Sequence, residues 1–152
     1  MIIKLGGKYI RKLNCKKTEY FDIEVYFNNS KACIRALADS GNSLKDNLGG
    51  NEIIICEYKS VKSFFPNDIE IKSDSVEMFK LLSETEIRNK LRLIPFKSLG
   101  ENNGLLLGLK ADKAVIKTPK PVEIKNVVIG VYCGELDSNG LFNSIINYET
   151  IL

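Results

Sequence analysis

Histidine is absent from this chain of 152 residues. Its absence excludes Ser-His-Asp and Cys-His catalysis, and it excludes most catalytic zinc sites, because these depend on imidazole. The side chains that remain for acid–base chemistry near neutral pH are carboxylates, lysine, tyrosine and cysteine. A mechanism based on carboxylates is therefore favoured by elimination.

Cysteine is scarce, and Cys15, Cys33, Cys56 and Cys133 include no Cys-x-x-Cys pair. Most of them lie in apolar, strand-like runs, so we expect free, buried thiols and neither a disulfide framework nor a zinc site. No apolar run is long enough to cross a bilayer, and the chain does not start with a secretory signal. These absences predict a soluble cytoplasmic domain.

The net charge is only +3, and lysines are interleaved with acidic residues along the chain. No motif combines aromatic and basic residues, so no nucleic-acid partner is expected. Hydrophobic residues make up 44% and charged residues 27% of the chain, a balance typical of a globular protein. With no internal repeat or low-complexity linker, residues 1–152 are predicted to form a single domain.

The spacing of apolar residues predicts a mainly β fold with two or three short helices, consistent with a small closed or partly open barrel. Residues 20–27 alternate between apolar and polar positions, and the turn at 28–30 indicates a hairpin. Strands are expected over residues 20–27, 31–38, 53–56, 92–96, 104–109, 114–116 and 127–131, and helices over 58–65, 74–82 and 141–146.

The helix beginning near Asp74 has a clear start signal. Asp74 is placed as its N-cap, and Glu77 is placed to complete a capping box. Val76, Phe79 and Leu82 follow at helical spacing, so we expect them to face the core. Residues 83–86 are expected to restart this helix.

The motif that carries chemistry is Asp39-Ser40-Gly41-Asn42, which follows an apolar strand. An aspartic peptidase uses such a loop because its carboxylate shares a proton with a second carboxylate and activates water. The hydroxyl can bond to the neighbouring loop, and the glycine permits a sharp turn. Asp-Ser-Gly is also an ordinary turn sequence, so a non-catalytic β-barrel that binds a protein, with Asp39 as a turn residue, stays open as an alternative.

The motif occurs once, so a catalytic Asp39 needs a second carboxylate from elsewhere. One hypothesis is a homodimer in which two Asp39 side chains meet at a two-fold axis and share one proton. Neither a metal nor a cofactor is required. The other hypothesis uses Asp137 of the same chain, although residues 137–140 are more typical of a turn.

Residues 92–109 are predicted to form a hairpin whose tip is long, polar and glycine-bearing. It is either an ordinary exposed hairpin or a mobile flap that closes over a substrate. Its position downstream of the acidic loop is the one expected of a flap. The candidate flap residues are Ser98, Leu99, Gly100, Asn103 and Gly104.

Taken in order, these segments resemble the sporulation sigma-E factor-processing peptidases, the SpoIIGA family. The resemblance covers nearly the whole chain from about Tyr20 onward. It is carried by residues 37–42, 92–100, 104–107 with 110–112, 128–130 and 140–146.

The resemblance implies a retropepsin-like (half-pepsin) acid-protease barrel that pairs with itself. Family members are membrane-bound aspartic peptidases whose peptidase domain faces the mother-cell cytoplasm. They remove the pro-sequence of a sigma factor, and a signalling protein from the forespore activates them. By position, Asp39 would be the catalytic residue, Ser40, Gly41 and Asn42 would support its loop, and residues 96–106 would form the flap.

Two features depart from the family pattern. The membrane-spanning N-terminal part is absent from this sequence, so activation by a signal could be missing. Residues 135–140 lack the apolar-apolar-glycine signature of retroviral relatives, which leaves the support beneath Asp39 open. Residues 1–5 and 149–152 are candidates for strands between subunits.

Overall fold

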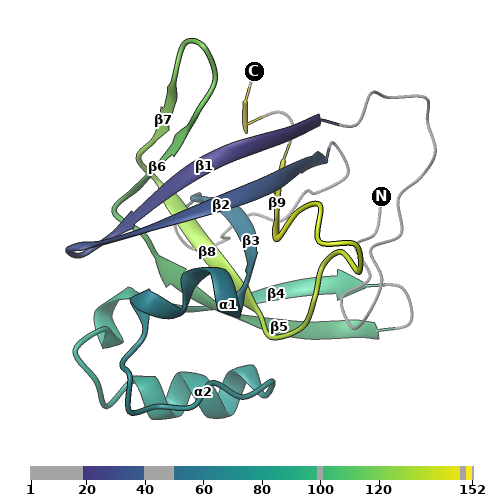
Figure 1. Ribbon diagram of the computed structural model, residues 1–152. Helices are drawn as coiled ribbons and strands as arrows, with labels where there is room; N and C mark the ends of the chain where they lie inside the picture. Colours follow the sequence, from purple (N-terminus) through teal and green to yellow (C-terminus); the bar gives the residue numbers. More distant parts are fainter. Residues whose placement is uncertain (1–18, 40–49, 99–100, 148–149, 152) are drawn as a thin grey trace.

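The computed structural model describes residues 19–39, 50–98, 101–147 and 150–151. Within these ranges the chain forms one open nine-stranded sheet with the order β4-β5-β8-β3-β9-β2-β1-β6-β7, and two short α-helices (Figure 1). The mainly β class predicted from the sequence is therefore confirmed. The strands are β1 Glu19–Phe27, β2 Ser30–Asp39, β3 Glu52–Glu57, β4 Leu91–Ser98, β5 Glu101–Lys110, β6 Lys113–Ile116, β7 Val122–Ile124, β8 Val127–Tyr132 and β9 Ser144–Asn147.

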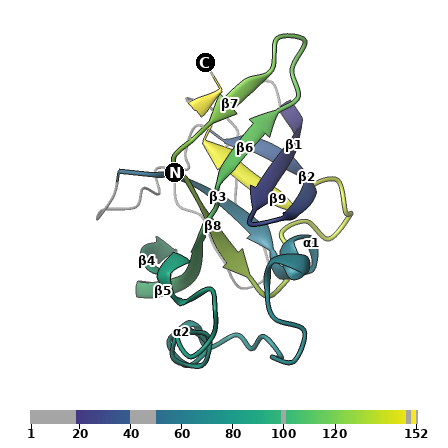
Figure 2. The ribbon, with the colours of Figure 1, turned by 90° about the vertical axis from the view of Figure 1, so that its left-hand side faces the viewer.

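The helix α2 lies at one end of the described molecule, next to β4 and β5, whereas α1 packs against β2 and β3 (Figures 1 and 2). The helices are α1 Tyr58–Val61, which continues into a 3-10 helix Lys62–Phe64, and α2 Ser75–Leu82, with a second 3-10 helix at Arg88–Lys90. The expected restart of α2 over residues 83–86 is wrong, because this segment consists of turns.

The start of α2 follows the sequence prediction. The Asp74 side chain accepts hydrogen bonds from the backbone N–H groups of Val76 (3.0 Å) and Glu77 (3.1 Å). The core-facing pair is Met78 and Leu82, four residues apart, whereas Val76 is 39% exposed. The prediction that Val76 faces the core is wrong, since the helix presents its 78/82 face to the hairpin and its first turn to solvent.

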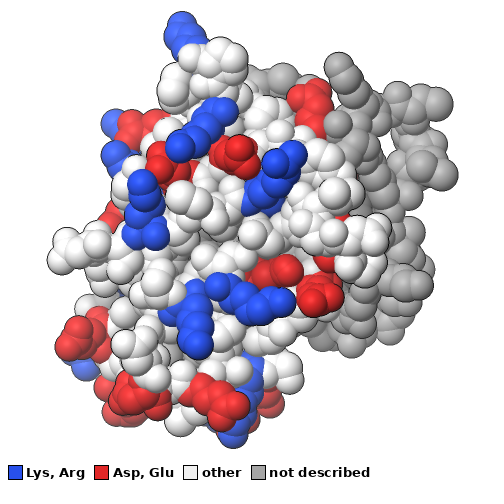
Figure 3. All heavy atoms as spheres, viewed as in Figure 1, with Lys and Arg blue, Asp and Glu red and all other residues white. Residues whose placement is uncertain are grey.

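The hairpin of β1 and β2 pairs from Glu19↔Ala38 to Phe27↔Ser30, with Asn28 in the left-handed region at φ 50°. Ile23, Val25 and Phe27 are buried on one face, as the alternation predicts. Charges of both signs are interspersed over the solvent face (Figure 3).

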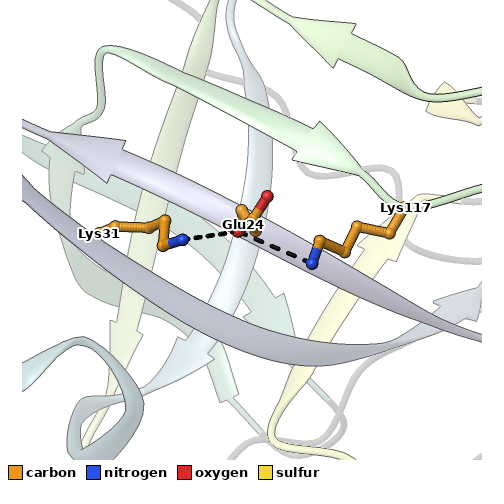
Figure 4. Close-up of polar contacts among 3 residues, drawn as sticks. All are labelled: Glu24, Lys31 and Lys117. Carbon is orange, nitrogen blue, oxygen red and sulfur yellow. Dashed lines mark hydrogen bonds and ion pairs between the residues drawn. The ribbon is translucent and has the colours of Figure 1, made fainter.

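Glu24 on β1 links the hairpin to the end of β6. Its Oε2 accepts a hydrogen bond from Lys31 Nζ at 2.9 Å and lies 3.7 Å from Lys117 Nζ (Figure 4). The hydrogen bond from Lys31 is the main cause that lowers the pKa of Glu24. Such surface pairs stabilise a fold only slightly, so this contact orients side chains more than it adds stability.

The strand β9 lies between β2, to which it is parallel, and β3, to which it is antiparallel. The predicted helix over residues 141–146 is therefore wrong. All four residues of β9 are buried, and Ile145 and Ile146 are completely inaccessible. A short apolar run that is covered on both faces has no alternation, so its sequence does not distinguish a strand from a buried helix.

The sheet has apolar side chains on both faces. The larger cluster includes Ile23, Val25 and Met78, and the smaller one groups Leu37 and Ile145 with others. Among the described cysteines only Cys56 is buried, so the expectation of buried thiols is wrong for the exposed Cys33 and Cys133. Searched over the described residues, the chain has no helix that is long and apolar enough to span a membrane.

Candidate functional site

Asp39 is the last residue of β2, and it is only 4% exposed. The strand that delivers it is buried from Ala36 onward, so the carboxyl group is carried by a rigid, packed element. A charge buried among apolar side chains must be hydrogen-bonded or paired with another charge. The acidic residue of the sequence motif is therefore buried at the end of a rigid strand. Ser40, Gly41 and Asn42 lie outside the described residues.

Asn147 is the residue that the fold places beside Asp39. The two are register partners in the parallel pairing of β2 with β9, and Asn147 is 8% exposed. Parallel strands end at the same edge of a sheet, so both side chains belong to one end of the β2–β9 pair. Sequence reasoning missed Asn147, because its neighbour in space is 108 positions away along the chain.

Asn143 fixes this register at the other end of β9. Its Oδ1 accepts from the backbone N–H of Arg35 at 3.0 Å, and its own N–H donates to the Arg35 carbonyl at 3.0 Å. Its carbonyl accepts from the Glu57 N–H at 2.9 Å. One residue thus ties β2 and β3 to the segment that enters β9, and sequence reasoning also missed this role.

Asp137 forms its hydrogen bonds within the turn to which it belongs. Its carboxylate accepts from the N–H groups of Leu141 (2.7 Å) and Asn139 (3.3 Å), and its carbonyl accepts from the Gly140 N–H (3.1 Å). Gly140 has φ +71°, a value that glycine adopts without strain. These bonds fit the turn interpretation of residues 137–140.

Glu57 is a second buried carboxyl group among the described residues, 6% exposed at the end of β3. Burial raises its pKa, while Lys59 and a hydrogen bond from the Leu136 backbone oppose that rise. The carboxylates of Glu135 and Asp137 add to it. Because Glu57 contacts the backbone of residue 136, it holds the loop before β9 against β3.

The predicted hairpin is confirmed as β4 and β5, paired from Leu91↔Leu109 to Ser98↔Glu101 with an irregularity between Phe96 and Ser98. Gly104 is the register partner of Phe96, and a Cβ at this position would overlap the Phe96 ring. Ser98 and Asn103 lie in the two strands, whereas Leu99 and Gly100 lie outside the described residues.

Among the described residues, no group of three or more Cys, Asp or Glu side chains is arranged to hold a metal ion. Residues 1–5, one of the two candidate intersubunit strands, also lie outside the described residues, and of 149–152 only 150 and 151 are described.

Comparison with known proteins gives one family. The family model described as sporulation factor SpoIIGA (Peptidase_U4) matches residues 1–150. The sporulation sigma-E factor-processing peptidase of Priestia megaterium is 27% identical over 146 residues, covering 94% of this chain and 48% of that protein. The protein of the same name from Bacillus subtilis is 27% identical over 143 residues, covering 91% and 46%.

The chain thus spans about half the length of these two relatives. A putative sporulation sigma factor-processing peptidase of Bacillus thuringiensis subsp. kurstaki is 24% identical over 151 residues, and here 95% of this chain aligns with 94% of the relative. No solved structure matches the chain significantly.

Proposed function

Because this chain belongs to the SpoIIGA family of sporulation factors, we propose that it is an aspartic endopeptidase that removes the pro-sequence of a sporulation sigma factor. The names of the three relatives, all sigma factor-processing peptidases, support the reaction and the class of substrate. The observation that carries the proposal is Asp39, a buried carboxyl group at the end of a packed strand and the first residue of the Asp-Ser-Gly sequence motif.

A retropepsin-like barrel is part of this proposal. It is supported by β9, which lies between the strand that delivers Asp39 and the strand that follows the Asp39 loop. This arrangement supports the end of β2 from the side, and the Asn143 bonds keep β9 in register. A general acid–base pair needs such rigid support, because a small displacement of a catalytic group lowers the rate strongly.

The chemistry follows from two carboxyl groups that share one proton, since two charges this close do not both ionise. In a homodimer, one Asp39 carboxylate takes a proton from water while the water oxygen attacks the scissile carbonyl carbon. The other Asp39 gives its proton to the carbonyl oxygen. The protonated Asp39 then gives its proton to the leaving nitrogen as the C–N bond breaks. The other Asp39 takes a proton from a hydroxyl group of the tetrahedral intermediate, so the pair again holds one proton.

The hairpin of β4 and β5 is proposed as the flap that covers the substrate and excludes water. Residues 96–106 are the proposed flap, and Phe96 packs over Gly104 near the tip end of the two paired strands. In the longer form represented by the relatives of twice this length, we place the domain at the cytoplasmic face of a membrane. A forespore signalling protein would then activate it.

Co-expression with a pro-sigma substrate tests the proposal by substrate size. We expect wild type and Asp137→Asn to shorten the substrate and Asp39→Asn to leave it intact. Asparagine preserves the shape of Asp39 but cannot take part in proton sharing, and thermal melting of each variant controls for folding. Equal processing by Asp39→Asn would reject Asp39 as the catalytic residue, and the mechanism with it. No processing by wild type would favour the alternative of a binding domain in which Asp39 is a turn residue. Loss of processing in both Asp39→Asn and Asp137→Asn, with both variants folded, would assign the second acid to Asp137.

A further inference from the structure

A pocket of about 470 Å³ lies on the hairpin side of the molecule. Its walls are residues 71–73 and 75 at the start of α2, residues 105–107 of β5 with Phe96 of β4, and residues 131–134, which include the end of β8 and the two residues after it. Its volume falls in the range of roughly 300–1,000 Å³ that is typical of ligand pockets. The Cys133 thiol donates to the Lys72 carbonyl at 3.4 Å, which joins two of these walls.

Two of the three β5 residues that line this pocket have no strand on the side away from β4, among the residues that the structure describes. The pairing of β5 with β8 covers residues 107–110, and β5 continues past it toward its N-terminal end. Residues 104–106 therefore have β4 on one side and no described strand on the other. An exposed strand edge of this kind accepts an extended peptide as an additional strand, with its side chains entering adjacent pockets.

Leu105 gives this edge an apolar anchor point. It is 42% exposed, one of four large hydrophobic residues that are exposed among those described. Ile71 and Phe96 lie at the same pocket and are half-buried. An apolar side chain from a partner would cover these groups, so the pocket fits a peptide with one or two large apolar residues.

Acidic residues lie in and around the segment 71–75 of this pocket. Within residues 70–77, three exposed acids stand beside one lysine, and Figure 3 shows acidic side chains gathered over the end where Figure 1 places α2. Lys72 itself lines the pocket, but its Nζ lies 4.0 Å from Glu77 Oε1. The surface therefore favours a partner segment with Lys or Arg beside its apolar residues. The acids are Glu70, Asp74 and Glu77.

We propose that this pocket is a second docking site for the pro-sigma substrate, separate from the scissile bond. An extended, basic segment of the substrate adds to β5 at residues 104–106 and places an apolar side chain against Leu105. The assignment to the substrate rests on the proposed function, since β5 belongs to the hairpin that would close over the cleaved segment. Docking on the same hairpin raises the local concentration of the cleavage site.

Binding of purified pro-sigma protein tests this docking, with Asp39→Asn in every chain so that the substrate is not cleaved. Fluorescence anisotropy of labelled pro-sigma gives Kd for the parent, for Leu105→Asp and for Leu81→Asp. Leu81 is the matched control, because it is 45% exposed and does not line the pocket. We expect Leu105→Asp to weaken binding roughly tenfold or more and Leu81→Asp to change it by less than about twofold. Glu70→Lys and added salt should also weaken it.

Two results would overturn the docking site: equal Kd for the Leu105 and Leu81 variants, or no binding of pro-sigma by the parent chain. The proposed peptidase function is tested separately, by measuring cleavage by chains that retain Asp39. Cleavage with an unchanged KM in Leu105→Asp would reject the docking site and retain the peptidase. Binding that depends on Leu105, without cleavage by wild type, would retain the docking site and reject the peptidase.

Discussion

Replacing Asn143 by alanine tests how β9 is held beside the strand that carries Asp39. The backbone bonds of residue 143 to Arg35 and Glu57 survive the change, because they use its N–H and carbonyl. What is lost is Oδ1, which accepts from the Arg35 N–H at 3.0 Å and from Ser144 Oγ at 3.4 Å. Ser144 is fully buried, so its hydroxyl loses an acceptor that water cannot easily replace.

The expected loss of stability follows from these two bonds. A hydrogen bond contributes about 0.5–1.5 kcal/mol net, and the longer one from Ser144 contributes less than the shorter one. Asn143→Ala should therefore lower the free energy of unfolding by about 1–2 kcal/mol. For a chain of this size that corresponds to about 2–8 °C in Tm. Asn143→Asp keeps an acceptor oxygen and should remain much closer to wild type.

Amide hydrogen exchange shows whether the effect is local. The N–H groups of Ile145 and Ile146 should exchange roughly five- to thirtyfold faster in Asn143→Ala, as expected for a loss of 1–2 kcal/mol, with smaller changes in Asn143→Asp. The pairing between β4 and β5, far from Asn143 in the sheet order, should change less. If alanine and aspartate destabilise equally, or if β9 exchanges as in wild type, the account of how Asn143 fixes β9 is refuted.

Three further predictions concern other contacts. Gly104→Ala should destabilise the chain by about 1–3 kcal/mol because its Cβ meets the Phe96 ring, and Phe96→Leu in the same chain should restore part of the loss in a urea titration. Burial raises the pKa of Glu57 above its ordinary value near 4.5, so the folded state holds this proton more tightly than the unfolded state. Its contribution to stability is therefore complete below about pH 4.5 and is lost as pH rises through the raised pKa, and Glu57→Gln should show a smaller decline in urea midpoint over that window. Asp74→Ala should lower stability by about 0.5–2 kcal/mol through loss of the N-cap, while Asp74→Asn, which keeps an acceptor, should retain most of it in thermal melts.

Elements specified by neighbouring residues could be predicted from the sequence. The β1–β2 hairpin follows from alternating apolar positions before a polar turn, and the β4–β5 hairpin from two apolar runs around a polar tip. The start of α2 follows from Asp74. The motif at Asp39 located a buried acid at the end of a strand. Each of these features depends on residues within one short stretch of chain, so local pattern is sufficient.

Features set by distant partners could not be predicted in this way. Ile145 and Ile146 are strand residues because β2 and β3 flank them, and both partners are far away in sequence. The same pairing brings Asn147 to Asp39 and gives Asn143 its bonds to Arg35. No single-sequence pattern encodes a parallel register across more than 100 residues, because either strand could pair with other apolar runs.

The central claim, that one active site needs an Asp39 from each of two chains, is tested most directly by mixing wild type with Asp39→Asn. Total chain concentration is held constant, subunits are allowed to exchange, and the initial rate of pro-sigma cleavage is measured against the fraction of wild type. A shared site predicts that the rate falls with the square of that fraction, to about a quarter in an equal mixture, because one wild-type chain in a mixed dimer supplies only half of the pair. A rate that falls in direct proportion, to about half, would contradict the account, since each wild-type chain would then be active by itself.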